Sequence, residues 1–121
     1  MISLMKRKTI RNHKDFITSP DSPKTITDFF IIKAKPVKIP GDARYGLVAS
    51  KRSFKFAVQR NRAKRLIRDW IAHSEDLMVD AMDYIFILRD RILNADRERG
   101  RAMMAIALNK ILKAYRKNAK A

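Results

Sequence analysis

Two helical segments stand out from the spacing of apolar residues along the chain. Within residues 63–71, apolar side chains recur at i, i+3, i+4, i+7 and i+8, which predicts an amphipathic helix over residues 57–73 with Trp70 in the core. A second apolar stripe predicts a last helix over residues 101–117, which begins after Gly100.

The other apolar segments favour strands. Residues 25–36 (TITDFFIIKAKP) are rich in β-branched and aromatic side chains and predict a strand that is split near Asp28. Residues 43–51 predict a second strand, and the Pro-Gly-Asp turn before it suggests that the two strands pair as an antiparallel hairpin. Residues 83–89 (DYIFILR) contain a continuous apolar run, which is typical of a strand covered on both faces.

The order of these elements indicates the fold class. The basic N-terminal segment predicts a short helix that ends near Thr18, because Pro20 and Pro23 exclude a long one. The order helix, strand, strand, helix, strand, helix then indicates an α+β fold, a two-layer sandwich. A chain of 121 residues suits one domain, residues 1–121, with a core over residues 6–117 and short flexible termini.

The charge of the chain narrows its possible partners. Twenty-eight Lys and Arg residues against twelve Asp and Glu residues give a formal net charge of +16. Such self-repulsion disfavours the compact state unless a polyanion neutralises it, so the composition points to nucleic acid or to an anionic membrane surface.

Several functional classes are disfavoured by what the sequence lacks. Without cysteine the chain has neither disulfides nor Cys-ligated zinc. HExxH, P-loop and GxGxxG motifs are absent and the acidic residues are scattered, so we predict no catalytic residue in the protein itself. No apolar run has the length of a signal-peptide core or of a membrane span, which predicts a cytoplasmic protein.

The densest basic segment spans residues 51–68, which contain eight Lys and Arg residues and no acid. On the predicted helix, Arg60, Lys64 and Arg68 are four residues apart and lie on one face beside the apolar stripe. Because like charges at this spacing destabilise an isolated helix, a bound anion explains them better than folding does. Asn61 beside them could contact a base, a 2′-hydroxyl or a metal-bound water, or could cap the helix.

Phe16 lies among basic residues near the N-terminus and has two interpretations. Its ring could stack on a base of a bound nucleic acid, or it could be an ordinary core residue. The sequence favours neither.

Residues 44–70 (RYGLVASKRSFKFAVQRNRAKRLIRDW) resemble the family of protein subunits of bacterial ribonuclease P. The resemblance is carried by RNRAKRLIRD and by the SKR that precedes it at the end of a predicted strand. KDF near the N-terminus, DYIFILR and the last basic helix extend it over about residues 6–117. It implies a ribosomal-protein-like sandwich whose mixed central sheet contains a left-handed βαβ crossover.

The resemblance also implies a function. The chain would bind a catalytic RNA subunit and the 5′ leader of precursor tRNA, and the RNA would hydrolyse the leader with Mg²⁺ that it binds mainly itself. Phe16 and Lys33 would contact the leader, and Asn61 could lie near a metal ion without being a direct ligand. The residues that match the family's RNA-binding surface are Lys51, Arg52, Arg60, Asn61, Arg62, Lys64, Arg65 and Arg68.

The chain departs from the family pattern at three places. Pro20 stands where some members carry a second aromatic residue, Lys33 where some carry an aromatic on the early strand, and SFKF (residues 53–56) where some have a Gly-Asn loop. Three alternative functions use the same charge: a structural RNA-binding protein such as a ribosomal component, a DNA-compacting protein, and a membrane-surface protein. The RNRAKRLIR pattern counts against the first two. The membrane-surface role is the weakest, because the basic helices also carry the apolar stripe that the sheet needs.

Overall fold

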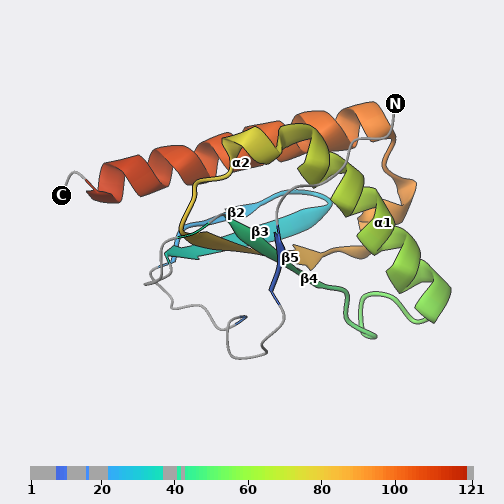
Figure 1. Ribbon diagram of the computed structural model, residues 1–121. Coiled ribbons are helices and arrows are strands. Elements are labelled where there is room, and N and C mark those ends of the chain that lie inside the picture. The colour runs from blue at the N-terminus through green and yellow to red at the C-terminus, as the bar shows by residue number, and fades with distance from the viewer. Residues whose placement is uncertain (1–7, 11–15, 17–21, 37–40, 42, 120–121) are drawn as a thin grey trace.

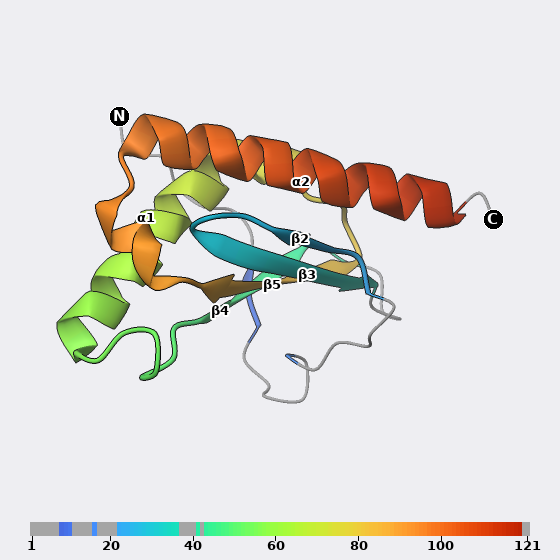
Figure 2. The ribbon, with the colours of Figure 1, turned by 180° about the vertical axis from the view of Figure 1, so that it is seen from behind.

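The computed structural model describes residues 8–10, 16, 22–36, 41 and 43–119. The described strands form one five-stranded mixed sheet, and both helices cover the same face of it (Figure 1 and Figure 2). This confirms the predicted α+β class and the two layers. The elements are β1 (Lys8–Thr9), β2 (Lys24–Ile26), β3 (Phe30–Pro36), β4 (Arg44–Val48), α1 (Ala57–Ser74), β5 (Met82–Leu88) and α2 (Arg97–Ala119), with 3₁₀ turns η2 (Glu75–Leu77) and η3 (Asp90–Asn94).

The predicted hairpin of consecutive strands is wrong. The sheet has the order β1-β4-β5-β3-β2, so β5 lies between β4 and β3 and pairs with β4 in parallel and with β3 antiparallel. All but one of the β5 residues are buried, and a strand that is apolar on both faces gains most from a central place in the sheet. The β4–α1–β5 connection is therefore a crossover between parallel neighbours, as the family resemblance implies, and its hand stays a prediction.

Other boundaries differ from the sequence prediction in smaller ways. The N-terminal helix falls mainly on residues outside the described part, and Lys8–Thr9 forms β1, which pairs in parallel with β4. Helix α2 begins one turn earlier than predicted, so Gly100 lies inside it. The predicted second strand ends at Val48, which leaves Lys51 in the turn that follows.

The split near Asp28 is confirmed and has a clear local cause. The Thr27 hydroxyl donates to the carbonyl of Phe30 at 2.8 Å and accepts the backbone N–H groups of Phe29 and Phe30 at 3.2 and 3.0 Å. A side chain that satisfies the turn in this way holds β2 and β3 as an antiparallel pair.

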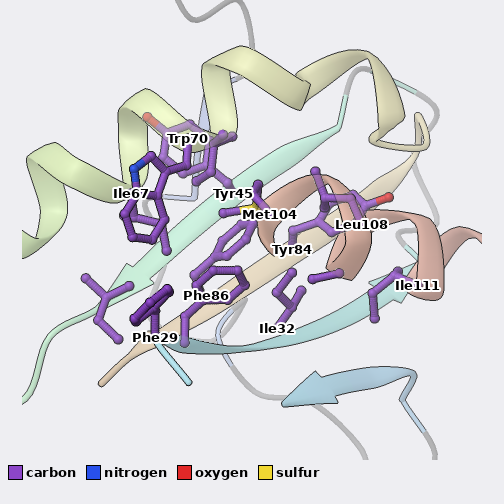
Figure 3. Close-up of a cluster of buried hydrophobic side chains, with 14 of the residues drawn as sticks. Phe29, Ile32, Tyr45, Ile67, Trp70, Tyr84, Phe86, Met104, Leu108 and Ile111 are labelled. Atoms are coloured by element: carbon purple, nitrogen blue, oxygen red, sulfur yellow. The ribbon is translucent and has the colours of Figure 1, made fainter. Parts of the chain in front are cut away.

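The core lies between the sheet and the two helices, and Trp70 belongs to it, as predicted (Figure 3). Trp70 is fully buried and packs with a tilted geometry against Phe29, at a ring-centroid distance of 5.8 Å. Phe30 and Phe86 meet edge to face at 6.0 Å on the sheet below. α1 and α2 pack together over this cluster, so α1 is anchored by its second half.

No helix in the described part of the chain is both long enough and apolar enough to cross a membrane.

Candidate nucleic-acid interface

Helix α1 presents several of its basic side chains to solvent. The helix buries Ala63, Ile67, Trp70 and Ile71, and its N-terminal end extends beyond the edge of the sheet (Figure 1 and Figure 2). On the opposite side, the exposed residues include Val58 and the polar residues Asn61, Arg62, Arg65 and Arg68. These four polar residues, which we call the α1 basic face, occupy neighbouring positions at i, i+1, i+4 and i+7.

Arg60 has a different place from the one its spacing suggested. Its Nη1 donates to the carbonyl oxygen of Phe54 at 2.9 Å and to that of Lys55 at 3.5 Å. Arg60 therefore holds the turn that enters α1, and both it and Lys64 are half-buried. The row Arg60–Lys64–Arg68 predicted from i, i+4 spacing is thus split: only Arg68 belongs to the most exposed face.

Asn61 is not a helix cap. The N-cap position of α1 is Phe56, five residues earlier, and Asn61 is exposed within the second turn. Its amide makes no hydrogen bond to another described residue, so one acceptor and two donors are available to a ligand. No group of three or more His, Cys, Asp or Glu residues that could hold a metal ion lies in the described part of the chain. The single amide oxygen of Asn61 does not make a resident magnesium site, so Asn61 would contact a metal ion only through a water molecule.

The first acidic residue after the basic segment turns away from the α1 basic face. Asp69 accepts two hydrogen bonds from Arg101 of α2, Nε to Oδ2 at 3.1 Å and Nη2 to Oδ1 at 3.0 Å. The hydrogen bond to Asp69 raises the pKa of the Arg101 guanidinium, which therefore stays fully charged. This pair joins α1 to α2 and leaves the α1 basic face without a neutralising carboxylate from its own helix.

The turn between β4 and α1 carries more exposed cations. Lys51, Arg52 and Lys55 are all exposed, while Phe54 between them is buried. The turn is closed by a hydrogen bond from the Phe54 N–H to the Ser50 carbonyl at 2.9 Å. Lys51 and Arg52 therefore continue the basic surface from the α1 N-terminus toward the sheet.

The sheet face away from the helices brings Phe16 and Lys33 onto one surface. Gly46 of β4 leaves room for the Phe16 ring, since a Cβ atom there would lie 2.7 Å from Cζ of the ring and would collide with Cε1. Ile85 is the register partner of both Gly46 and Lys33, and Lys33 is the partner of Lys24. We call the surface formed by these five residues, Phe16, Gly46, Ile85, Lys33 and Lys24, the sheet row.

Phe16 packs against the sheet and keeps part of its surface accessible to solvent. Its ring packs on the backbone of Gly46 and near Ile10, yet the residue is only half-buried. Lys24 and Lys33 lie directly opposite each other on adjacent strands, where like charges are destabilising. An anion bound to the sheet row would relieve that repulsion.

An ion pair with a buried carboxylate lies on the same face of the sheet. Arg44 donates from Nε and Nη2 to the two carboxylate oxygens of Asp83 at 2.8 and 2.7 Å, and Asp83 is 1% exposed. The two residues are register partners on β4 and β5. Their bidentate geometry satisfies the buried carboxylate and fixes the parallel register at one end of the sheet row.

Sequence reasoning missed two features of this surface. The link from Arg60 to the backbone of the entry turn joins residues five and six apart, and no residue pattern announces it. Phe56 is exposed although its neighbour Phe54 is buried, and the only signal was the departure of SFKF from the family's Gly-Asn loop.

Comparison with known proteins identifies the family. A family model described as Ribonuclease P matches residues 4–112. The ribonuclease P protein component of Lactobacillus delbrueckii subsp. bulgaricus is 29% identical over 107 residues, which is 88% of each chain. That of Marinobacter nauticus is 33% identical over 78 residues, which covers 64% of this chain and 58% of that protein.

Solved structures agree in fold. The ribonuclease P protein of Staphylococcus aureus superposes with a TM-score of 0.66 at 23% identity, over 91% of this chain and 96% of that one. The Thermotoga maritima ribonuclease P protein superposes with a TM-score of 0.61 at 16% identity, over 74% of this chain and 84% of that one. With a family model matched over nearly its whole length, this chain belongs to the Ribonuclease P family.

Proposed function

We propose that this chain is the protein subunit of a bacterial ribonuclease P. It binds the catalytic RNA subunit through the α1 basic face and the entry turn, and it assists removal of the 5′ leader from precursor tRNA. The observation that carries the proposal is the surface over residues 51–68, eight cations without an acid on a projecting helix end, in a chain of this family. Phosphate groups are the ligands that such a surface neutralises, with release of counterions.

The protein's own residues position the RNA and neutralise its phosphates, and they take no part in bond cleavage. Hydrolysis would be carried out by the RNA subunit, where bound Mg²⁺ would supply Lewis-acid chemistry. The arginine forks of the α1 basic face can each hold a phosphate by two hydrogen bonds. Neutralising the backbone where RNA strands crowd lowers their mutual repulsion, so the folded RNA needs less free magnesium.

The first test is cleavage of a 5′-extended precursor tRNA by the cognate catalytic RNA at low Mg²⁺, with and without this protein. We expect strong stimulation at low Mg²⁺ that shrinks as Mg²⁺ rises, because metal ions and the protein neutralise the same phosphates. Tight RNA binding without stimulation would instead favour the structural RNA-binding alternative.

The sheet row is the proposed contact for the 5′ leader. Phe16 offers an aromatic ring held on Gly46, and Lys33 and Lys24 offer cations two and three strands away on the same face. A single-stranded leader matches this arrangement, because its bases stack on aromatic rings while its phosphates meet cations.

Replacing Phe16 by leucine tests the leader contact. Leucine keeps an apolar side chain on Gly46 but removes the π-face, so we expect weaker binding of leader-bearing precursor by the holoenzyme, roughly 5- to 150-fold for one lost stack of about 1–3 kcal/mol. Binding of mature tRNA should not change. Ile10→Val, a change beside the same ring, is the matched control. Equal losses for precursor and mature tRNA would assign Phe16 to packing alone.

A further inference from the structure

Phe56 is an unusual residue for its position at the start of α1. It is the N-cap, where Ser, Thr, Asp or Asn normally accepts a backbone N–H, and its ring can accept none. Only the reverse bond is made, from the Phe56 N–H to Oε1 of Gln59 at 3.1 Å. Relative to a capping side chain, this choice costs the helix about 1 kcal/mol.

Packing of the Phe56 side chain does not compensate for this loss of helix stability. Its side chain is 56% exposed, and among the Phe, Tyr and Trp residues of the chain, all of which lie in the described part, it alone is exposed. Phe54, two residues earlier, is the residue that fills the core from this turn. The fold therefore uses one phenylalanine of SFKF and leaves the other in solvent.

The surroundings of Phe56 are cationic and held in place. Lys55 Nζ lies 5.6 Å from the centroid of the Phe56 ring, and Arg60 holds the carbonyls of Phe54 and Lys55 just before it. The ring is thus presented by a fixed turn, between the cations of that turn and those of the α1 basic face. The backbone that carries the ring is held before any ligand arrives, which lowers the entropy lost on binding.

We propose that Phe56 stacks on an unpaired base of the RNA that docks against α1, while Lys55 contacts a phosphate next to that base. The inference rests on the proposed function, because it names a contact within the same RNA interface. Charge complementarity selects the occupant: residues 51–68 contain eight Lys and Arg residues and no acidic residue, so an anionic partner surface is complementary to the surroundings of the ring. RNA offers both an anionic backbone and π-faces, and stacking tolerates any base.

The test compares Phe56→Ser with Phe56→Trp in binding to the cognate catalytic RNA over a series of salt concentrations. Serine restores a capping side chain, so the thermal midpoint should rise or hold while affinity falls roughly 5- to 150-fold, the equivalent of one stack of about 1–3 kcal/mol. The dependence of log K on log salt should not change, because no charge is lost. Phe56→Trp should bind within about 2-fold of the unmodified protein, because tryptophan keeps the stacking surface.

Two further measurements separate a base contact from other effects. Emission of the tryptophan introduced at residue 56 should be quenched by the RNA, with the unmodified protein, whose Trp70 is buried, as the background. Ile106→Ala is the matched control, since Ile106 is 53% exposed on α2, and it should leave affinity unchanged.

Three results would overturn the inference. Unchanged affinity of Phe56→Ser, with salt-dependent binding of the unmodified protein intact, would remove the stacking contact and leave the proposed function standing. Self-association that disappears in Phe56→Ser would make a second copy of the chain the occupant. Absence of any salt-dependent RNA binding by the unmodified protein would overturn the proposed function and this contact together.

Discussion

Replacing Arg62, Arg65 and Arg68 together by alanine is expected to weaken binding to the catalytic RNA on the order of 10³-fold at low salt, because each lost charged hydrogen bond contributes roughly 1.5 kcal/mol. The salt slope should become shallower by about 2, since each phosphate contact contributes about 0.7 to 0.9. These three are the exposed arginines of the α1 basic face. Filter binding or fluorescence titration across a salt series measures both quantities.

The fold should survive this triple replacement. Alanine is the best helix former, and none of the three side chains makes a hydrogen bond or ion pair within the described part of the chain. Arg60→Ala would be a poorer test, because it would also release the carbonyls of Phe54 and Lys55.

A second triple variant controls for overall charge. Lys110, Lys113 and Arg116 are exposed cations of α2, and their replacement by alanine removes the same three charges. If the α1 contacts are local, this control should lose much less affinity and keep most of the salt slope. Equal losses in the two variants would show that only the net charge of the protein matters, and the α1 basic face would no longer be the docking surface.

Replacing Gly100 by alanine is expected to destabilise the fold by about 1–3 kcal/mol, although alanine is the better helix former by about 1 kcal/mol. A Cβ atom on Gly100 would lie 2.7 Å from Cδ2 of Trp70 and closer still to two other atoms of its ring. The ring is fully buried between helices and sheet, so it cannot move aside as an exposed side chain would. Overpacking therefore outweighs propensity, and urea unfolding should show a lower midpoint.

Two further variants test whether the effect of Gly100→Ala comes from the contact with the Trp70 ring. Gly41→Ala should be neutral, because no atom of the described residues lies within 4 Å of a Cβ built there. Trp70→Phe removes the part of the ring system that Gly100 meets, so Gly100→Ala should be less damaging in that background, a coupling that a double-mutant cycle measures. A raised midpoint for Gly100→Ala alone would show that α1 and α2 can separate, contrary to the close crossing seen here.

The helices and the central strand could be predicted from the sequence because their signals are local. The apolar stripe through Ile67 and Trp70 repeats at the helical period, and the same residues are buried in α1. The DYIFIL run predicted a strand covered on both faces, and β5 is central in the sheet. The placement of Gly100 as a break before the last helix was wrong, because its role is to admit the Trp70 ring, which lies thirty residues away in the sequence.

The candidate interface was predicted in part. A cation-rich segment without acids can be recognised in a sequence, since charge does not depend on the fold, and the resemblance to a known family supplied the RNA partner. Which cations of the segment are exposed, and which one stabilises the fold, could not be predicted. Helical spacing placed Arg60, Lys64 and Arg68 together, whereas the packing of α1 on the sheet exposes Arg62 and Arg65 and leaves Arg60 to hold the entry turn.

The sequence by itself determined the charge, the helix periods and the buried strand, because these follow from residues within one or two turns of each other. Only the tertiary structure decided which strands are neighbours, and therefore that Phe16, Lys33 and Lys24 share one face. It also decided which phenylalanine of SFKF is buried. Those outcomes depend on pairing between segments far apart in the chain, where the total burial of β5 outweighs the local preference of a short Pro-Gly turn for a hairpin.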